Sequence, residues 1–95
     1  MLGYNGQQFI NNWIQVHSDM AAQAFILLNC VLGKESELLE HLKAYDEVIE
    51  GYIVMGSFDL IIKVEVPDAK DLRPLVTNKI RTLPGVRQSM TVIVV

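Results

Sequence analysis

Two apolar, β-type segments meet at a short corner in the middle of the chain. The segment Val48–Met55 precedes the corner Gly56-Ser57-Phe58, and the segment Asp59–Val66 follows it. A corner this short has no room for a helical crossover, so the two segments must pair as antiparallel neighbours in a hairpin. Any fold of this chain is therefore built around this hairpin.

Similar patterning continues on both sides of the hairpin. Ala24–Val31 predicts a strand with two apolar faces. Lys34–Tyr45 predicts a helix, because its leucines recur at helical spacing. A second helix is expected over Asp71–Leu83 after an irregular entry, with Pro74 in its first turn, where a missing N–H costs little. Val86–Val95 predicts the last strand.

The order strand, helix, strand, strand, helix, strand predicts an α+β, ferredoxin-like βαββαβ fold. Right-handed crossovers put both helices on one face of a four-stranded antiparallel sheet with spatial order 4-1-3-2. The other face is uncovered in a single subunit. Because 51% of the residues are hydrophobic and only 20% are charged, we expect a second copy to cover it, sheet to sheet. We place Ile26 on this face, so that Ile26→Glu should break the dimer.

The charge and composition of the chain argue against several classes of function. The net charge is -3 and the eight Lys and Arg residues are scattered, which argues against direct binding to nucleic acid. Cys30 is the single cysteine, so it cannot form an internal disulfide, and we expect a reducing, cytoplasmic location. No apolar stretch reaches the length of a bilayer span, so no membrane partner is expected. His17 and His41 lack ligand-spaced neighbours, and we expect no metal and no cofactor.

Residues 1–23 differ in composition from the rest of the chain. Asp19 is their only acidic residue, and they contain no Lys or Arg. The spacing of their apolar residues predicts a short helix near Gln7–Val16. We therefore divide the chain into an N-terminal extension, residues 1–23, and one domain, residues 24–95.

Four segments together carry a family resemblance: Ala24–Leu28, Val54–Leu60, Leu83–Val86 and Ser89–Val94. Over residues 24–95 the chain resembles the effector-binding domain, or RAM domain, of the Lrp/AsnC (feast/famine) transcription regulators. Regulators of that family carry a helix-turn-helix domain ahead of this one. Residues 1–23 are too short for such a module, so the chain resembles a stand-alone form, and DNA binding is not carried over.

The resemblance implies a function and a site. Domains of this family dimerise through their sheets, the dimers assemble further, usually as a ring of four, and small amino-acid-type effectors bind where dimers meet. A full-length Lrp/AsnC regulator is then a further partner. By position in the motif, the implied pocket combines a corner from one subunit with strand residues from a neighbour: Met55, Gly56, Ser57, Phe58 and Asp59, and Ser89, Met90 and Thr91.

The chemistry of the corner agrees with an amino-acid ligand. The Asp59 carboxylate can accept hydrogen bonds from an ammonium group, and the peptide N–H groups around Gly56 can donate to a carboxylate. The hydroxyls of Ser57 and Thr91 can do either. Plainer readings stay open: Asp59 can satisfy N–H groups of the turn, Phe58 can be a packing residue, and Ser89 and Thr91 can be ordinary strand residues. Ser57 stands where the family often has an acidic or amide residue, which leaves the effector open.

Two other functions stay open beside the non-enzymatic sensor that we favour. A small dimeric α+β barrel enzyme of the oxygenase or isomerase type would work in a cleft between sheet and helices. Such a site needs a His, Asn or Trp there, or a paired acid and base, and the sequence offers little besides Asn29. The third reading is a purely structural oligomerisation module. We expect no catalytic residue.

Overall fold

The computed structural model describes residues 21–95, so the helix predicted near Gln7–Val16 lies outside the described residues. The elements, in chain order, are β2 (Ala22–Cys30), α1 (Glu35–Lys43), β3 (Val48–Ile53), β4 (Leu60–Val66), the second helix (Ala69–Ile80) and β5 (Val86–Ile93). The second helix has three consecutive parts: a 3-10 turn (Ala69–Asp71), α2 (Leu72–Pro74) and a π-helical part (Leu75–Ile80). No helix within residues 21–95 is long and apolar enough to cross a membrane.

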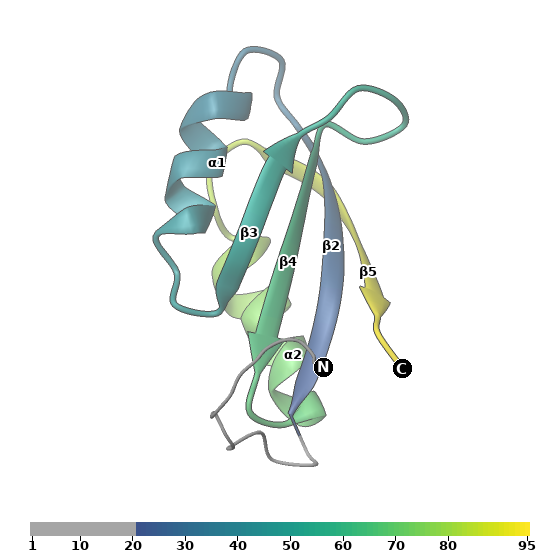
Figure 1. Cartoon of the computed structure of the whole chain (residues 1–95). Helices are drawn as coiled ribbons and strands as arrows, with labels where there is room; N and C mark the ends of the chain where they lie inside the picture. The colour runs from purple at the N-terminus through teal and green to yellow at the C-terminus, as the bar shows by residue number, and fades with distance from the viewer. Residues whose placement is uncertain (1–20) are drawn as a thin grey trace.

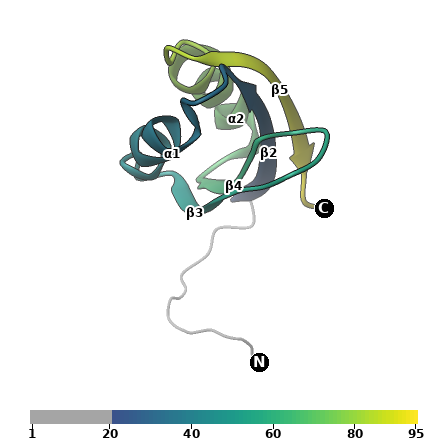
Figure 2. The same ribbon diagram turned by 90° about the horizontal axis from the view of Figure 1, so that it is seen from above.

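The four strands form one antiparallel sheet in the order β3-β4-β2-β5 (Figure 1). This is the spatial order that right-handed crossovers predict. Seen from above, α1 and α2 both lie on the same side of the sheet (Figure 2). The predicted α+β, ferredoxin-like sandwich is therefore confirmed, and the face of the sheet opposite the helices is left without a covering layer in the described chain.

The core lies between the sheet and the helices. Every second residue of the two central strands is buried there, together with leucines of α1 and three apolar residues of the second helix: Ala24, Ile26, Leu28, Cys30, Leu60, Ile62, Val64, Val66, Leu38, Leu42, Leu72, Leu75 and Ile80. Ile26 is completely buried and pairs with Ile62 on the helix side. Its expected place on the uncovered face is wrong, because both faces of β2 are apolar and the strand alone does not show which face the helices cover.

The pairing of the outer strand β3 with β4 contains a β-bulge. Val48 pairs with Val64 of β4, but Glu50 pairs with Lys63, so Ile49 is an extra residue in β3. Strict alternation would put Val48 on the same face as Glu50. Because the bulge inserts one residue, Val48 instead packs against the core.

The second helix ends earlier and more irregularly than its spacing predicts. The Arg81 N–H donates to the Val76 carbonyl at 2.8 Å, a bond that spans five residues and marks the π-helical part. The Thr82 hydroxyl then donates to the carbonyls of Asn78 and Lys79, at 3.0 and 3.2 Å. These bonds satisfy carbonyls at the end of the helix, which stops at Ile80 and not at Leu83.

Gly51 of β3 is buried where the sheet packs against Leu39 of α1. A Cβ added there would lie 2.9 Å from Leu39 Cδ1 and 3.0 Å from Ile62 Cγ2. We expect Gly51→Ala to lower the free energy of unfolding by about 1–2 kcal/mol, because the added methyl overfills a packed layer. Urea denaturation at matched protein concentration measures this cost. In a Leu39→Ala background the cost should fall by more than half, and an equal cost in both backgrounds would contradict the contact.

Candidate functional site

Met55–Asp59 forms a loop at the end of the sheet where β3 passes to β4 (Figure 1). The Val54 N–H donates to the Asp59 carbonyl at 2.9 Å, which closes the loop. Gly56 has a φ of +153°, a conformation that other residues rarely adopt. Met55 is fully exposed, and Gly56 and Ser57 are exposed as well. The loop therefore offers its peptide groups and the Ser57 hydroxyl to anything that binds from outside the subunit.

Three hydrogen bonds hold this loop against the end of β2. The Asp59 N–H donates to the Leu28 carbonyl at 2.8 Å. The Cys30 N–H donates to Asp59 Oδ2, and the Asn29 side-chain amide donates to the Ser57 carbonyl, both at 2.9 Å. These bonds anchor the loop at both Ser57 and Asp59, and the backbone N–H of Cys30 fixes the position of the Asp59 carboxylate.

The two oxygens of the Asp59 carboxylate are in different situations. Oδ2 accepts from Cys30, which is the structural role that an aspartate in a turn commonly has. Oδ1 makes no hydrogen bond within residues 21–95, and the side chain is only half-buried. An ionised carboxylate can accept several hydrogen bonds. The structural role of Asp59 therefore leaves capacity for a ligand.

Cys30, the neighbour of Asp59 in this arrangement, is not set up as a nucleophile. Its side chain is buried and forms no disulfide. Burial, and then the negative charges of Glu35 and Asp59, raise the pKa of the Cys30 thiol. The thiol therefore stays protonated near neutral pH, and packing is the role that this environment supports.

The three expected site residues of β5 do not all lie on the same face of the sheet. Ser89 and Thr91 pair with the buried residues Leu28 and Ile26, so their side chains lie on the helix side of the sheet. Met90, between them, lies on the opposite face, because side chains alternate along a strand. Within one subunit β2 separates Ser89 from the corner, because Leu28 pairs with Ser89 on one side and accepts the hydrogen bond from Asp59 on the other.

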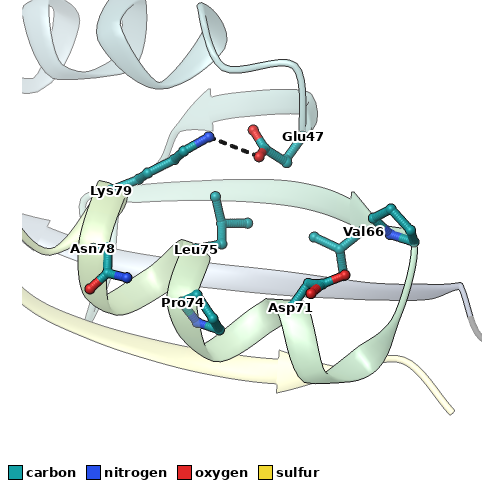
Figure 3. Close-up of a pocket in the computed structure, with 8 residues that line it drawn as sticks. Glu47, Val66, Asp71, Pro74, Leu75, Asn78 and Lys79 are labelled. Carbon is teal, nitrogen blue, oxygen red and sulfur yellow. Dashed lines mark hydrogen bonds and ion pairs between the residues drawn. The ribbon is translucent and has the colours of Figure 1, made fainter.

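A hollow of about 360 Å³ lies between the second helix and the end of β4 (Figure 3). Lys79 reaches from the helix toward Glu47, and its Nζ lies 3.0 Å from Glu47 Oε2. This hydrogen bond lowers the pKa of Glu47. The same Nζ lies 5.5 Å from the centre of the Tyr45 ring. Because Lys79 and Glu47 satisfy each other, this hollow is a weaker candidate for a charged ligand than the corner.

A second hollow, between the second helix and β5, was missed by the reasoning from sequence. Arg73, Thr77 and Arg81 of the helix and Thr91 of β5 line it, above an apolar floor that includes Leu72. The sequence signal is a pair of arginines, Arg73 and Arg81, each four residues from Thr77. This spacing does not stand out in the sequence, because the apolar stripe of the helix explains the segment on its own.

The described chain is a small ferredoxin-like βαββαβ sandwich with a solvent-facing glycine corner, and residues 21–95 contain no cluster of potential metal ligands. Residues 23–95 match the family model of the Lrp/AsnC ligand binding domain, and the chain belongs to this family. The resemblance read from the four sequence segments is thereby confirmed.

Individual relatives agree with the family. The chain is 34% identical over 71 residues to the HTH-type transcriptional regulator FL11 of Pyrococcus horikoshii, across 75% of this chain and 46% of that protein. It is 37% identical over 49 residues to the leucine-responsive regulatory protein of Escherichia coli, across 52% of this chain and 30% of that protein. The solved structure of FFRP-DM1 has a TM-score of 0.76 and 44% identity, and covers 78% of this chain and 99% of its own. The chain thus spans less than half the length of the curated regulators.

Proposed function

We propose that this chain is an effector-binding and oligomerisation domain that senses amino acids or related metabolites at subunit interfaces and modulates transcription regulators. The proposal rests on the exposed corner, Met55–Asp59, of a chain that matches the family model of the Lrp/AsnC ligand binding domain. Its carboxylate, Asp59, is fixed by the Cys30 N–H and has an oxygen to spare. One relative, the Escherichia coli regulator, is leucine-responsive by name.

The corner offers complementary groups to the two ends of an amino acid. The N–H groups of Gly56 and Ser57 make no hydrogen bond within residues 21–95, so they can donate to a carboxylate. Asp59 Oδ1 can accept from the ammonium group. Ser89 and Thr91 of a neighbouring subunit complete the proposed pocket, together with Met55 and Phe58 of the corner, whereas Met90, expected from the sequence to join them, lies on the opposite face of β5. A cleft between subunits excludes water and strengthens each of these contacts.

The sheet face opposite the helices supports association with a second copy. Four apolar side chains lie side by side across all four strands of this face, in the register Tyr52–Ile61–Leu27–Met90. Tyr52 and Met90 are 55% and 50% exposed in the single subunit. A continuous apolar row of this kind is rarely left to solvent, and a two-fold axis lets the same row cover itself.

Effector binding and assembly are coupled in this proposal. A ligand that bridges two dimers binds only the assembled form, and mass action then shifts the equilibrium toward that form. The domain would alter a full-length Lrp/AsnC regulator by assembling with it, in the cytoplasm. A cleft enzyme has less support: Asn29 alternates with the buried Leu28 and Cys30 and therefore lies on the other face, where its amide binds the Ser57 carbonyl.

Thermal unfolding of the wild-type protein, titrated with each of the twenty amino acids at millimolar concentration, tests the proposal. At least one amino acid should raise the unfolding temperature, because a ligand at about 100 times its Kd stabilises the bound form by about 2.7 kcal/mol. The N-acetyl and amide derivatives of that amino acid, which lack the ammonium or the carboxylate, should have no effect. Unchanged unfolding with all twenty would favour the purely structural module.

A further inference from the structure

The hollow between the second helix and β5 has a chemistry that the corner lacks. Its volume is about 360 Å³, which falls at the lower end of the range for small-molecule sites. Its lining residues include two arginines, Arg73 and Arg81, and two threonines, Thr77 and Thr91. Among residues 21–95 the remaining lining is apolar and contains no acidic residue. A site of this composition accepts an anion and an apolar group but has no partner for an ammonium.

The two arginines are available to a ligand. Within residues 21–95 neither Arg73 nor Arg81 has an ion pair or a side-chain hydrogen bond, and both are exposed. A guanidinium group presents paired donors that match the two oxygens of a carboxylate. An anion in the hollow would therefore meet unneutralised donors without having to break an existing ion pair.

The π-helical part of the second helix supports a functional reading of this surface. Runs of π-helix are rare, and single turns of this kind often occur at functional sites. Here the π-helical part, Leu75–Ile80, directly precedes Arg81 and contains Thr77. Arg73, Thr77 and Arg81 line the same hollow, so the irregular turn keeps three polar residues at four-residue spacing on one side of the helix. Thr91 faces them from β5, which within the described residues is an edge strand paired with β2.

We propose that this hollow binds a small monocarboxylate that has a branched apolar tail and no amino group, such as a 2-oxo acid. The carboxylate lies between Arg73 and Arg81, the two threonine hydroxyls orient it, and the tail packs on the apolar floor at Leu72 and Val76. The two proposals share Thr91, but this site rests on Arg73 and Arg81 and not on Asp59, where the corner favours an ammonium group, so it does not depend on the function proposed for the corner.

Isothermal titration calorimetry on the full chain, with 4-methyl-2-oxopentanoate as the probe, tests this site. We expect saturable binding, and binding at least about tenfold weaker in the double variant Arg73→Gln/Arg81→Gln, because hydrogen bonds to charged groups are lost. The matched control is Arg87→Gln/Lys43→Gln, which removes the same charge at exposed positions outside the hollow; its affinity should stay within about twofold of the wild-type value.

Several other results of these titrations would overturn the proposal. No saturable binding by the wild-type protein, or equal affinity in the double variant, would overturn it. If the neutral 4-methylpentanamide binds as tightly as the acid, the hollow does not recognise a carboxylate. If inorganic phosphate binds equally tightly, the hollow does not recognise an apolar tail. Either result would overturn the proposal. If the double variant does not fold, Thr77→Glu at the exposed Thr77 places a like charge in the hollow, and undiminished affinity there would equally overturn the site. Asp59→Asn should leave this affinity unchanged, so the two sites succeed or fail separately.

Discussion

We expect Leu27→Asp to convert an assembled protein into folded single subunits. Leu27 lies at the centre of the uncovered sheet face, between Ile61 of β4 and Met90 of β5. It is not part of the core between sheet and helices. A carboxylate at this position therefore stays hydrated in a single subunit and is buried only when a second copy packs on the face.

The expected effect is large because a two-fold interface contains each substitution twice. Each buried carboxylate costs several kcal/mol without a partner, and each lost leucine removes a further 1.5–3 kcal/mol of burial, roughly. We therefore expect the dissociation constant of the dimer to rise by at least about a thousandfold, or about 4 kcal/mol. The fold of the subunit should be retained.

Light scattering during size-exclusion chromatography measures this change. The wild-type protein should elute as a multiple of 10.7 kDa, and the Leu27→Asp variant as a single subunit with an unchanged far-ultraviolet circular dichroism spectrum. Leu32→Asp is the matched control, since Leu32 is 92% exposed in the turn after β2; it should assemble normally. A Leu27→Asp variant that elutes like the wild-type protein would contradict packing through this face.

The order of the elements could be predicted because local patterns determine it. In β4, Lys63 and Glu65 alternate with the apolar residues that the structure buries, so one face is marked by its charges. In β2 both faces are apolar, and Phe25 and Leu27 look as suited to the core as Ile26. The misplacement of Ile26 follows from this: the choice of face depends on where the helices pack, which no residue of β2 shows.

The exposed corner could be predicted from the sequence, but the contacts that hold it in place could not. The motif around Gly56 indicates an exposed corner, and the structure has one. The hydrogen bond from Cys30 to Asp59 joins residues 29 positions apart in the sequence, and it depends on the pairing of β2 with β4. The hollow at Arg73 and Arg81 likewise requires the second helix to pack beside β5. Such sites arise from tertiary packing, and local periodicity does not reveal them.

Asp59→Asn should separate the structural role of this residue from its role in effector binding. Asparagine keeps an oxygen that can accept from the Cys30 N–H, but it carries no charge for an ammonium group. We expect a protein of near wild-type stability whose affinity for the amino-acid effector falls by about 10- to 100-fold, because a charge-assisted hydrogen bond is lost. Asp59→Ala should lose both functions, with a further drop of about 1–3 kcal/mol in stability, because the Cys30 N–H loses its partner.

Thermal unfolding with and without the stabilising amino acid distinguishes these variants. Without ligand, the unfolding temperature should decrease only in Asp59→Ala; with ligand, the rise should be lost in both variants. Asp46→Asn makes the same chemical change at an exposed position in the turn between α1 and β3 and should respond to ligand as the wild-type protein does. Because the loop geometry is preserved in Asp59→Asn, a full ligand response in that variant would show that the carboxylate charge is not part of the binding site. The Asp59 carboxylate would then have the structural role alone, and recognition of the ammonium would have to come from another subunit.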